Sequence, residues 1–136
     1  MAWVLDPSLA LAAAFPDESS ELADRFLERL APPQEAWVPA LWWYEVANAL
    51  TTGIRRGRIS EADGTRVFQI FSQLSLQTDF GADADTAWRL VILARAQGLS
   101  AYDASYLELA LRRGLGLASL DSRLRAAAKA AGVRII

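Results

Sequence analysis

Short strand-like runs alternate with longer segments of helical periodicity along this chain of 136 residues. Between consecutive runs lies at least one segment whose apolar positions recur three or four residues apart, the spacing of a buried helix face. This alternation predicts an α/β domain with a mostly parallel sheet of about five strands, flanked by helices. The predicted strands are AWVL (2–5), AWVP (36–39), LSLQT (74–78), LGLASL (115–120) and VRII (133–136).

The helical segments carry sequence signals for their ends. Asp6 followed by Pro7 is typical of a helix start, with the aspartate as cap and the proline at the first helical position. The stretch SEAD, from Ser60, has the form of a capping box. The predicted helices cover residues 7–15, 17–30, 40–56, 60–74, 83–97, 99–113 and 121–131. Because no linker or repeat interrupts this order, we expect one domain over residues 1–136.

The residue composition restricts the chemistry. The chain contains neither cysteine nor histidine. Disulfides, thiolate or imidazole metal sites and the Ser-His-Asp and Cys-His forms of catalysis are therefore excluded. Any metal held by side chains must be bound through oxygen atoms, which favours hard cations such as Mg²⁺ or Mn²⁺.

The net charge of −2 does not indicate bulk attraction to nucleic acid, although a local basic patch stays open. No apolar run reaches the about 18 residues that a membrane-spanning helix needs. The N-terminus also lacks the basic segment of a signal peptide. We therefore expect a cytoplasmic protein that does not enter a membrane.

Three aspartates lie where a chemical role and a capping role are both open. Asp6 and Asp121 follow predicted strands, so both would lie at the carboxyl edge of the sheet, where ligands bind in such folds. Asp103 lies in the first turn of its predicted helix. Each aspartate also suits a helix N-terminus, where a cap contributes about 0.5–2 kcal/mol. Among the remaining acids, we expect Glu108 on an exposed helix face.

Glu45, in the stretch LWWYEVANAL, has no such local explanation. It lies inside a predicted helix, and no lysine or arginine stands three or four residues away to pair with it. Asn48, three residues on, shares its helix face. Two interpretations stay open. Either this face is a solvated stripe between apolar faces, or Glu45 is buried beside a cation, because an unpaired buried carboxylate costs several kcal/mol.

In order and context, these four acids resemble those of the PIN-domain ribonucleases, especially the VapC-type toxins of toxin–antitoxin pairs. The matching pieces together span residues 4 to about 132. They are VLDPSLAL, PALWWYEVANAL, RRGRIS, GLSAYDASYLELA and GLASLDSRL. The resemblance implies a three-layer PIN-like fold and a metal-dependent endoribonuclease that acts as a toxin.

The resemblance also implies the composition of the site. The residues that match the family's acidic pocket for Mg²⁺ or Mn²⁺ are Asp6, Glu45, Asp103 and Asp121, the last acting through water. The residues that match supporting positions are Ser8, Asn48 and Ser119. Four converging carboxylates repel one another unless some are protonated or a cation joins them. Such a cation promotes phosphodiester hydrolysis without histidine or cysteine.

The family further implies three partners: RNA as substrate, a cognate antitoxin, and a second copy in a homodimer. The candidate RNA contacts are Arg55, Arg56 and Arg58, which also suit an ordinary helix end. Trp42 and Trp43 suit either the core or an interface. Two other functions stay open: a PIN-like nuclease of RNA maturation, and a catalytically silent module that binds RNA or protein.

Overall fold

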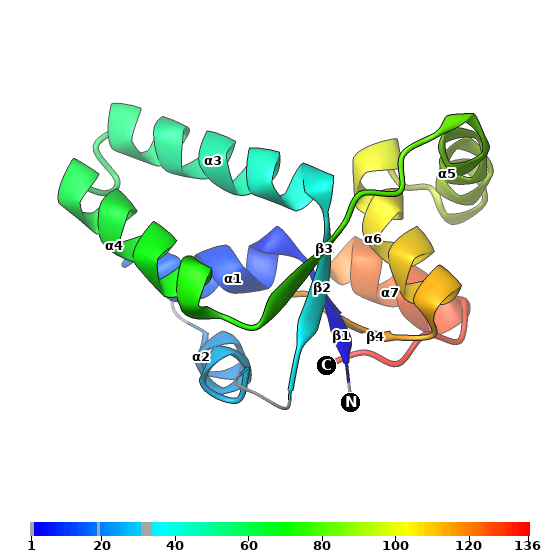
Figure 1. The fold of residues 1–136 in the computed structure, drawn as a ribbon, viewed down its shortest axis with the longest axis horizontal. Coiled ribbons are helices and arrows are strands. Elements are labelled where there is room, and N and C mark those ends of the chain that lie inside the picture. The colour runs from blue at the N-terminus through cyan, green and yellow to red at the C-terminus, as the bar shows by residue number, and fades with distance from the viewer. Residues whose placement is uncertain (1, 19, 31–33) are drawn as a thin grey trace.

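A computed structural model describes residues 2–18, 20–30 and 34–136, and within them a parallel sheet has four strands in the order β3–β2–β1–β4 (Figure 1). The strands are β1 (Trp3–Leu5), β2 (Ala36–Pro39), β3 (Leu76–Asp79) and β4 (Gly116–Ala118). All three strand pairs are parallel. Their carboxyl ends therefore meet at one edge of the sheet, and helical crossovers connect them.

Helices cover both faces of the sheet and give the molecule three layers, as predicted (Figure 1). Helices α1 (Pro7–Ala14), α2 (Glu21–Glu28), α3 (Ala40–Arg55) and α4 (Glu61–Gln73) lie on one side. Helices α5 (Ala84–Gln97), α6 (Ala101–Arg113) and α7 (Ser122–Ala130) lie on the other. Among the described residues, no helix combines the length and apolarity that crossing a membrane demands.

The predicted helix starts are largely confirmed by side-chain caps. Asp6 accepts a hydrogen bond from the Ser8 amide and caps α1, and Ser60 caps α4 in a full capping box. The second helix is shorter than the predicted 17–30. It begins at Glu21, because the Ser20 hydroxyl accepts a hydrogen bond from the Ala23 amide and so fixes the first turn there.

The prediction of about five strands was wrong by one. Residues 133–136 make only an isolated parallel bridge, between Ile135 and Leu117, in place of a fifth strand. The Leu117 amide donates to the Arg134 carbonyl, and the Ile136 amide donates to the Leu117 carbonyl. The segment thus pairs with β4 around a single residue, which is too short a ladder to count as a strand.

The core lies between the sheet and the helices on either side. Val4 of β1, Val38 of β2 and Leu117 of β4 are fully buried. Trp42 is also fully buried, with its ring centroid 5.4 Å from that of Phe71. It therefore belongs to the core, whereas the partly buried Trp43 packs against the core and donates from Nε1 to the Thr78 hydroxyl, 2.9 Å away.

Candidate active site at the carboxyl edge of the sheet

Asp6 is the most deeply placed of the four predicted site acids, with only 6% of its surface exposed. It follows β1, and the pairing of Leu5 with Ala118 brings it beside Ser119, the residue after β4. The Ser119 hydroxyl donates to Asp6 Oδ2 at 2.9 Å, and the hydroxyl and amide of Ser8 donate to the same oxygen. The two predicted supporting serines therefore both contact Asp6.

The environment of Asp6 disfavours its charge. Burial raises the pKa of this carboxyl to about 6, although the hydrogen bonds from Ser8 and Ser119 act in the opposite direction. The negative charge of Glu45 adds to the rise in pKa. Among the described residues, the donors to Asp6 are neutral hydroxyls and an amide, and no arginine or lysine forms an ion pair with it, so these dipoles solvate its charge.

Glu45 is half-buried in α3, and its partner is neither a cation nor a residue of its own helix. The hydroxyl of Tyr106, in α6, donates to Glu45 Oε1 at 2.5 Å. Tyr106 itself is fully buried. Burial raises the pKa of Glu45, the bond from Tyr106 lowers it, and the nearby charge of Asp103 raises it. Glu45 thus faces the interior of the site, and the interpretation of a solvated stripe does not hold for it.

Sequence reasoning missed Tyr106. Its one local signal is its position three residues after Asp103, which puts both side chains on the same face of α6. Nothing in the sequence near Glu45 identifies a partner 61 residues away. The contact depends on how α3 and α6, which lie on opposite faces of the sheet, approach each other.

Asp103 and Asp121 lie at helix starts, as their sequence context indicates. The Asp103 amide donates to the Ser100 hydroxyl at 3.1 Å, which leaves the Asp103 carboxylate in the first turn of α6. Asp121 caps α7 by accepting from the amides of Arg123 and Leu124 through Oδ1. The Asp121 amide donates to the Ser119 hydroxyl, so Ser119 links Asp121 to Asp6.

The four acids occupy one region but do not form a closed set of metal ligands. The charge of Asp103 contributes to the raised pKa of Glu45, and the charge of Glu45 contributes to the raised pKa of Asp6. Even so, no three acidic side chains in the described parts of the chain are close enough to form a ready-made metal group. Ligation of one cation by three of them would require side-chain movement towards a common point.

The chemistry of the donor set nonetheless fits a hard cation. All potential side-chain ligands are oxygen atoms, and the ion pairs found within the described residues include none of the four acids. A divalent cation would offset the burial, and the smaller mutual repulsion, that disfavour ionised Asp6 and Glu45. The arrangement is therefore suited to recruit a cation that the protein does not supply.

In the part of the chain that the structure describes, none of the remaining predicted residues hydrogen-bonds to Asp6. Asn48 is exposed one turn after Glu45, and Arg55 and Arg56 are exposed at the end of α3. Ten residues of helix separate Glu45 from Arg55, about 15 Å along the axis. Arg58 donates to the carboxylates of Asp17 and Glu18 and stacks on the ring of Phe15, 4.3 Å from its centroid.

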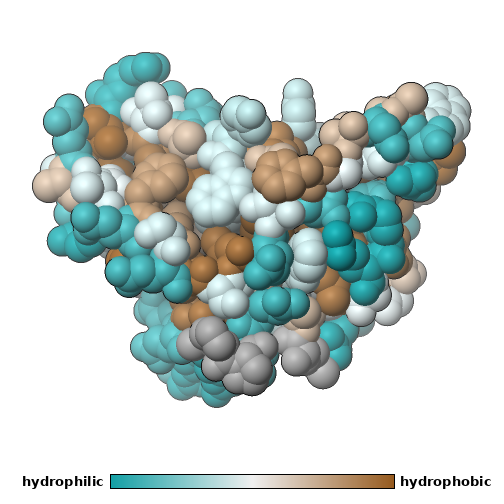
Figure 2. All heavy atoms as spheres, in the orientation of Figure 1, coloured by the Kyte–Doolittle hydropathy of each residue, from teal (hydrophilic) through white to brown (hydrophobic). Residues whose placement is uncertain are grey.

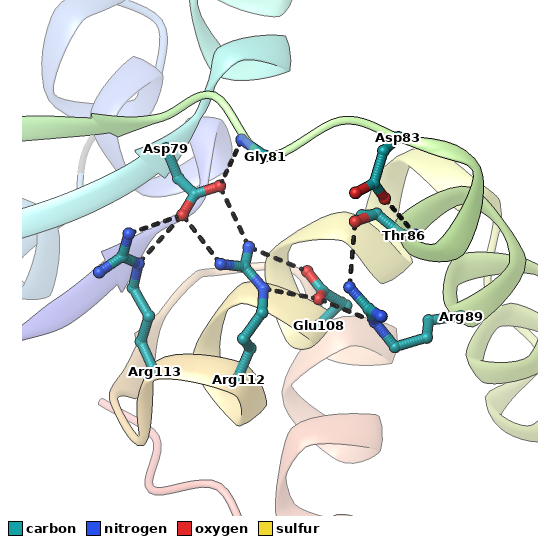
Figure 3. A network of polar contacts seen from close by, with 8 residues as sticks. All are labelled: Asp79, Gly81, Asp83, Thr86, Arg89, Glu108, Arg112 and Arg113. Atoms are coloured by element: carbon teal, nitrogen blue, oxygen red, sulfur yellow. Dashed lines mark hydrogen bonds and ion pairs between the residues drawn. The ribbon is translucent and has the colours of Figure 1, made fainter.

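A second ionic cluster lies at the end of the edge strand β3 (Figure 3). Asp79 accepts from Arg112 and Arg113, and Arg112 also donates to Glu108, which lies 3.6 Å from Arg89. The prediction that Glu108 is exposed was wrong, because only 7% of its surface is accessible. Arginines from α5 and α6 make this burial possible by neutralising the carboxylate.

Comparisons with known proteins show what this chain is similar to. A family model described as PIN domain matches residues 3–130. The chain is 32% identical over 124 residues to Ribonuclease VapC3 of Pyrobaculum aerophilum, covering 91% of this chain and 92% of that one. It is 33% identical over 123 residues to VapC ribonuclease Mb0985 of Mycobacterium bovis, covering 89% and 87%.

Two solved structures have similar folds. The crystal structure of PAE2754 from Pyrobaculum aerophilum superposes with a TM-score of 0.72 at 26% identity, covering 99% of this chain and 83% of that one. The structure of VapBC2 from Rickettsia felis, bound to a DNA fragment from its promoter, gives a TM-score of 0.71 at 13% identity. It covers 100% of this chain and 98% of the matched chain.

Proposed function

This chain belongs to the PIN domain family, and we propose that it is an endoribonuclease dependent on Mg²⁺ or Mn²⁺ that hydrolyses RNA phosphodiester bonds. The observation that carries the proposal is the group of acids around Asp6, which hydroxyls and amides hold but which no arginine or lysine in the described chain neutralises. Relatives named as ribonucleases, at 32% and 33% identity, support the same activity.

Asp6, Glu45, Asp103 and Asp121 are the residues that would hold the metal. A bound divalent cation would supply an activated water and stabilise negative charge on the phosphate. Ser8 and Ser119 hold the Asp6 carboxylate in one orientation. Tyr106 does the same for Glu45, and the amides at the start of α7 hold Asp121.

We further propose that the enzyme is a toxin restrained by a cognate antitoxin. A solved neighbour is described as VapBC-1 of nontypeable Haemophilus influenzae, and another as a toxin–antitoxin complex from Klebsiella pneumoniae. The uncompensated acids would attract a basic side chain of such a partner. Apolar residues also gather on the face shown in Figure 2, over α4, where Phe68 and Ile70 are exposed.

A homodimer is the other expected assembly. Helix α5 exposes Trp88, Val91 and Ile92, which are spaced three and four residues apart and so share one helix face. Neighbouring exposed apolar residues of this kind are typical of a protein interface. Sedimentation equilibrium of the wild type and of Ile92→Glu tests this, since a charge within the contact would shift the population to monomer. Unchanged sedimentation of the variant would place the contact elsewhere.

RNA contacts outside the acidic pocket are proposed for Arg55 and Arg56, at the end of α3. Arg58 is a weaker candidate because Asp17 and Glu18 already bind its guanidinium. Replacing a phosphate contact weakens binding to all sequences alike and reduces the salt dependence of binding.

The decisive experiment is hydrolysis of total cellular RNA by the purified protein. We expect cleavage with Mg²⁺ or Mn²⁺ and none with EDTA, with Asp6→Asn or with Glu45→Gln. Equal cleavage under all of these conditions would refute the assignment. RNA binding without hydrolysis in any metal would instead favour a silent binding module. Growth arrest on expression, relieved by a co-expressed antitoxin, would distinguish a toxin from an enzyme of RNA maturation.

A further inference from the structure

A cavity of about 420 Å³ opens between the start of α3, the connection from β3 to α5, the first half of α5, and helix α6. Its walls are mostly apolar, with Leu41, Leu90 and Leu109 among them. Its volume lies within the range of about 300–1,000 Å³ that is usual for small-molecule sites. The cavity is therefore large enough to hold one flat ring.

Two exposed aromatic side chains border this cavity. Phe80, in the β3–α5 connection, is 78% exposed, and Tyr102, in the first turn of α6, is 66% exposed. Leaving aromatic rings in water forgoes the free energy that burial would provide. Two such rings at the mouth of one apolar cavity indicate a binding surface.

The cavity and the acidic pocket share their supporting helices. Leu41, in the cavity wall, stands one helical turn before Glu45 and so lies on the same face of α3. Tyr102, at the mouth, directly precedes Asp103 in α6. An RNA strand bound at the four acids would therefore have its neighbouring nucleotides beside the cavity.

The charges at the base of the cavity are already paired with one another (Figure 3). Arg112 donates to Asp79 at 3.0 Å and to Glu108 at 2.8 Å, and the Gly81 amide donates to Asp79. A phosphate or a carboxylate would have to displace one of these bonds. A neutral ring with a polar edge would displace none, so charge complementarity favours an uncharged ligand.

From this geometry we propose that the cavity binds an unpaired nucleobase of the RNA, adjacent to the bond that is cleaved, by stacking on Phe80 and Tyr102. The inference rests on the proposed ribonuclease function and adds a specificity site to it. Single-stranded RNA is recognised in this manner, with splayed bases stacked on aromatic side chains. The site would select for RNA that is unpaired next to the cut.

The test measures binding of short fluorescent single-stranded RNAs to the Asp6→Asn protein, which we expect to bind RNA without cutting it. Stacking contributes about 1–3 kcal/mol per base, so Phe80→Ala with Tyr102→Ala should weaken binding by about 5- to 150-fold. Tyr102→Phe keeps the ring and should restore most of the affinity lost in Tyr102→Ala. Phe68→Ala removes an exposed ring of α4, away from the cavity, and serves as the control.

The outcomes separate this proposal from the ribonuclease assignment. Equal RNA affinity and identical cut sites in Phe80→Ala/Tyr102→Ala would overturn the base site while hydrolysis upholds the enzyme. Base-dependent binding in a wild-type protein that cleaves no RNA would uphold the cavity and overturn the enzyme. A double variant that loses only antitoxin binding, with RNA affinity intact, would also overturn the base site. Unchanged thermal unfolding of each variant would show that it remains folded.

Discussion

Two acidic clusters at the same edge of the sheet differ in what neutralises them. Asp79 ends β3 and accepts hydrogen bonds from Arg112 and Arg113, the first of which holds its pKa down at about 2. Asp6 follows β1 and, within the described ranges, accepts only from serine hydroxyls and an amide, and burial raises its pKa to about 6. Asp79 is therefore part of an ion-pair cluster within the fold, whereas the Asp6 carboxylate has no such pair in the described part of the chain and could bind an external cation.

The comparison gives a physical criterion for separating structural from functional acids in this fold. A buried carboxylate paired with guanidinium groups is already satisfied and would have to lose an ion pair to bind a metal. A buried carboxylate that is solvated only by dipoles keeps its charge uncompensated, and a bound cation would stabilise its ionised form. By this criterion Asp6 and Glu45 are ligand candidates, whereas Asp79 and Glu108 are not.

The largest expected effect is on activity at the uncompensated cluster. Asp6→Asn should reduce metal-dependent RNA hydrolysis by at least about 100-fold, since even the partners that orient metal ligands contribute about 10- to 100-fold. Because asparagine caps helices as well as aspartate does, α1 should keep its start and the fold its stability. Initial rates of cleavage and urea unfolding of the same samples measure both quantities. If Asp6→Asn unfolds more easily and still cleaves RNA, Asp6 has a structural role and not a catalytic one.

The next effect is on stability at the paired cluster. Asp79→Asn should lower the free energy of unfolding by about 2–3 kcal/mol, less than the about 3–5 kcal/mol of a fully buried pair because the arginines remain partly exposed. Asp85→Asn, at an exposed acid of α5, is the matched control and should cost less than about 0.5 kcal/mol. Indistinguishable unfolding of the two variants in urea would show that the cluster does not stabilise the fold.

Acid conditions sharpen this second prediction. The pKa of Asp79 is lowered in the folded protein, so its ion pairs stabilise the fold above the unfolded-state pKa of about 3.8. That contribution is lost as the pH falls through about 2, where the folded carboxyl becomes protonated. The difference in unfolding free energy between wild type and Asp79→Asn should therefore shrink between pH 4 and pH 2. A difference that stays constant over this range would assign the effect of the substitution to packing.

A smaller effect is expected from the tyrosine that holds Glu45. Tyr106→Phe removes the hydroxyl donor and keeps the ring in the core, so we expect a roughly tenfold weaker metal affinity with little change in RNA affinity. Electron paramagnetic resonance of free Mn²⁺ during a titration reads metal binding without relying on turnover. Tyr106 is a positioning residue by this argument. Equal Mn²⁺ binding with slower cleavage would instead assign its hydroxyl to a later step.

The smallest effect is a thermal shift on metal addition. At Mn²⁺ concentrations about five times the dissociation constant, binding should stabilise the folded protein by about 1 kcal/mol. Asp6→Asn should lose this shift, while Asp79→Asn should keep it from its lower starting point. If Asp79→Asn alone lost the thermal shift, the metal would bind at the ion-paired cluster around Asp79 and not at Asp6.

The sequence predicted the architecture where the relevant signals are local. Alternation of short runs with helical segments was enough to predict a parallel α/β sheet, and caps such as Asp6 and Ser60 located helix starts. The same local reasoning singled out Glu45, because a helix interior without a basic neighbour is readable from spacing alone. The predicted strand count was wrong at residues 133–136. Whether this segment forms one bridge or a full strand depends on how far it runs alongside β4, which its own sequence does not determine.

Only the tertiary structure decided what surrounds each acid. The partner of Glu45 lies 61 residues away in Tyr106, and Asp79 and Arg112 are 33 residues apart. Strand register and helix packing set these distances, and neither is encoded in the spacing of residues within one segment. Residue types alone showed that the chain has acids and arginines at several helix ends. The fold decided that the arginines neutralise Asp79 and Glu108, and that Asp6 and Glu45 accept hydrogen bonds from hydroxyl groups.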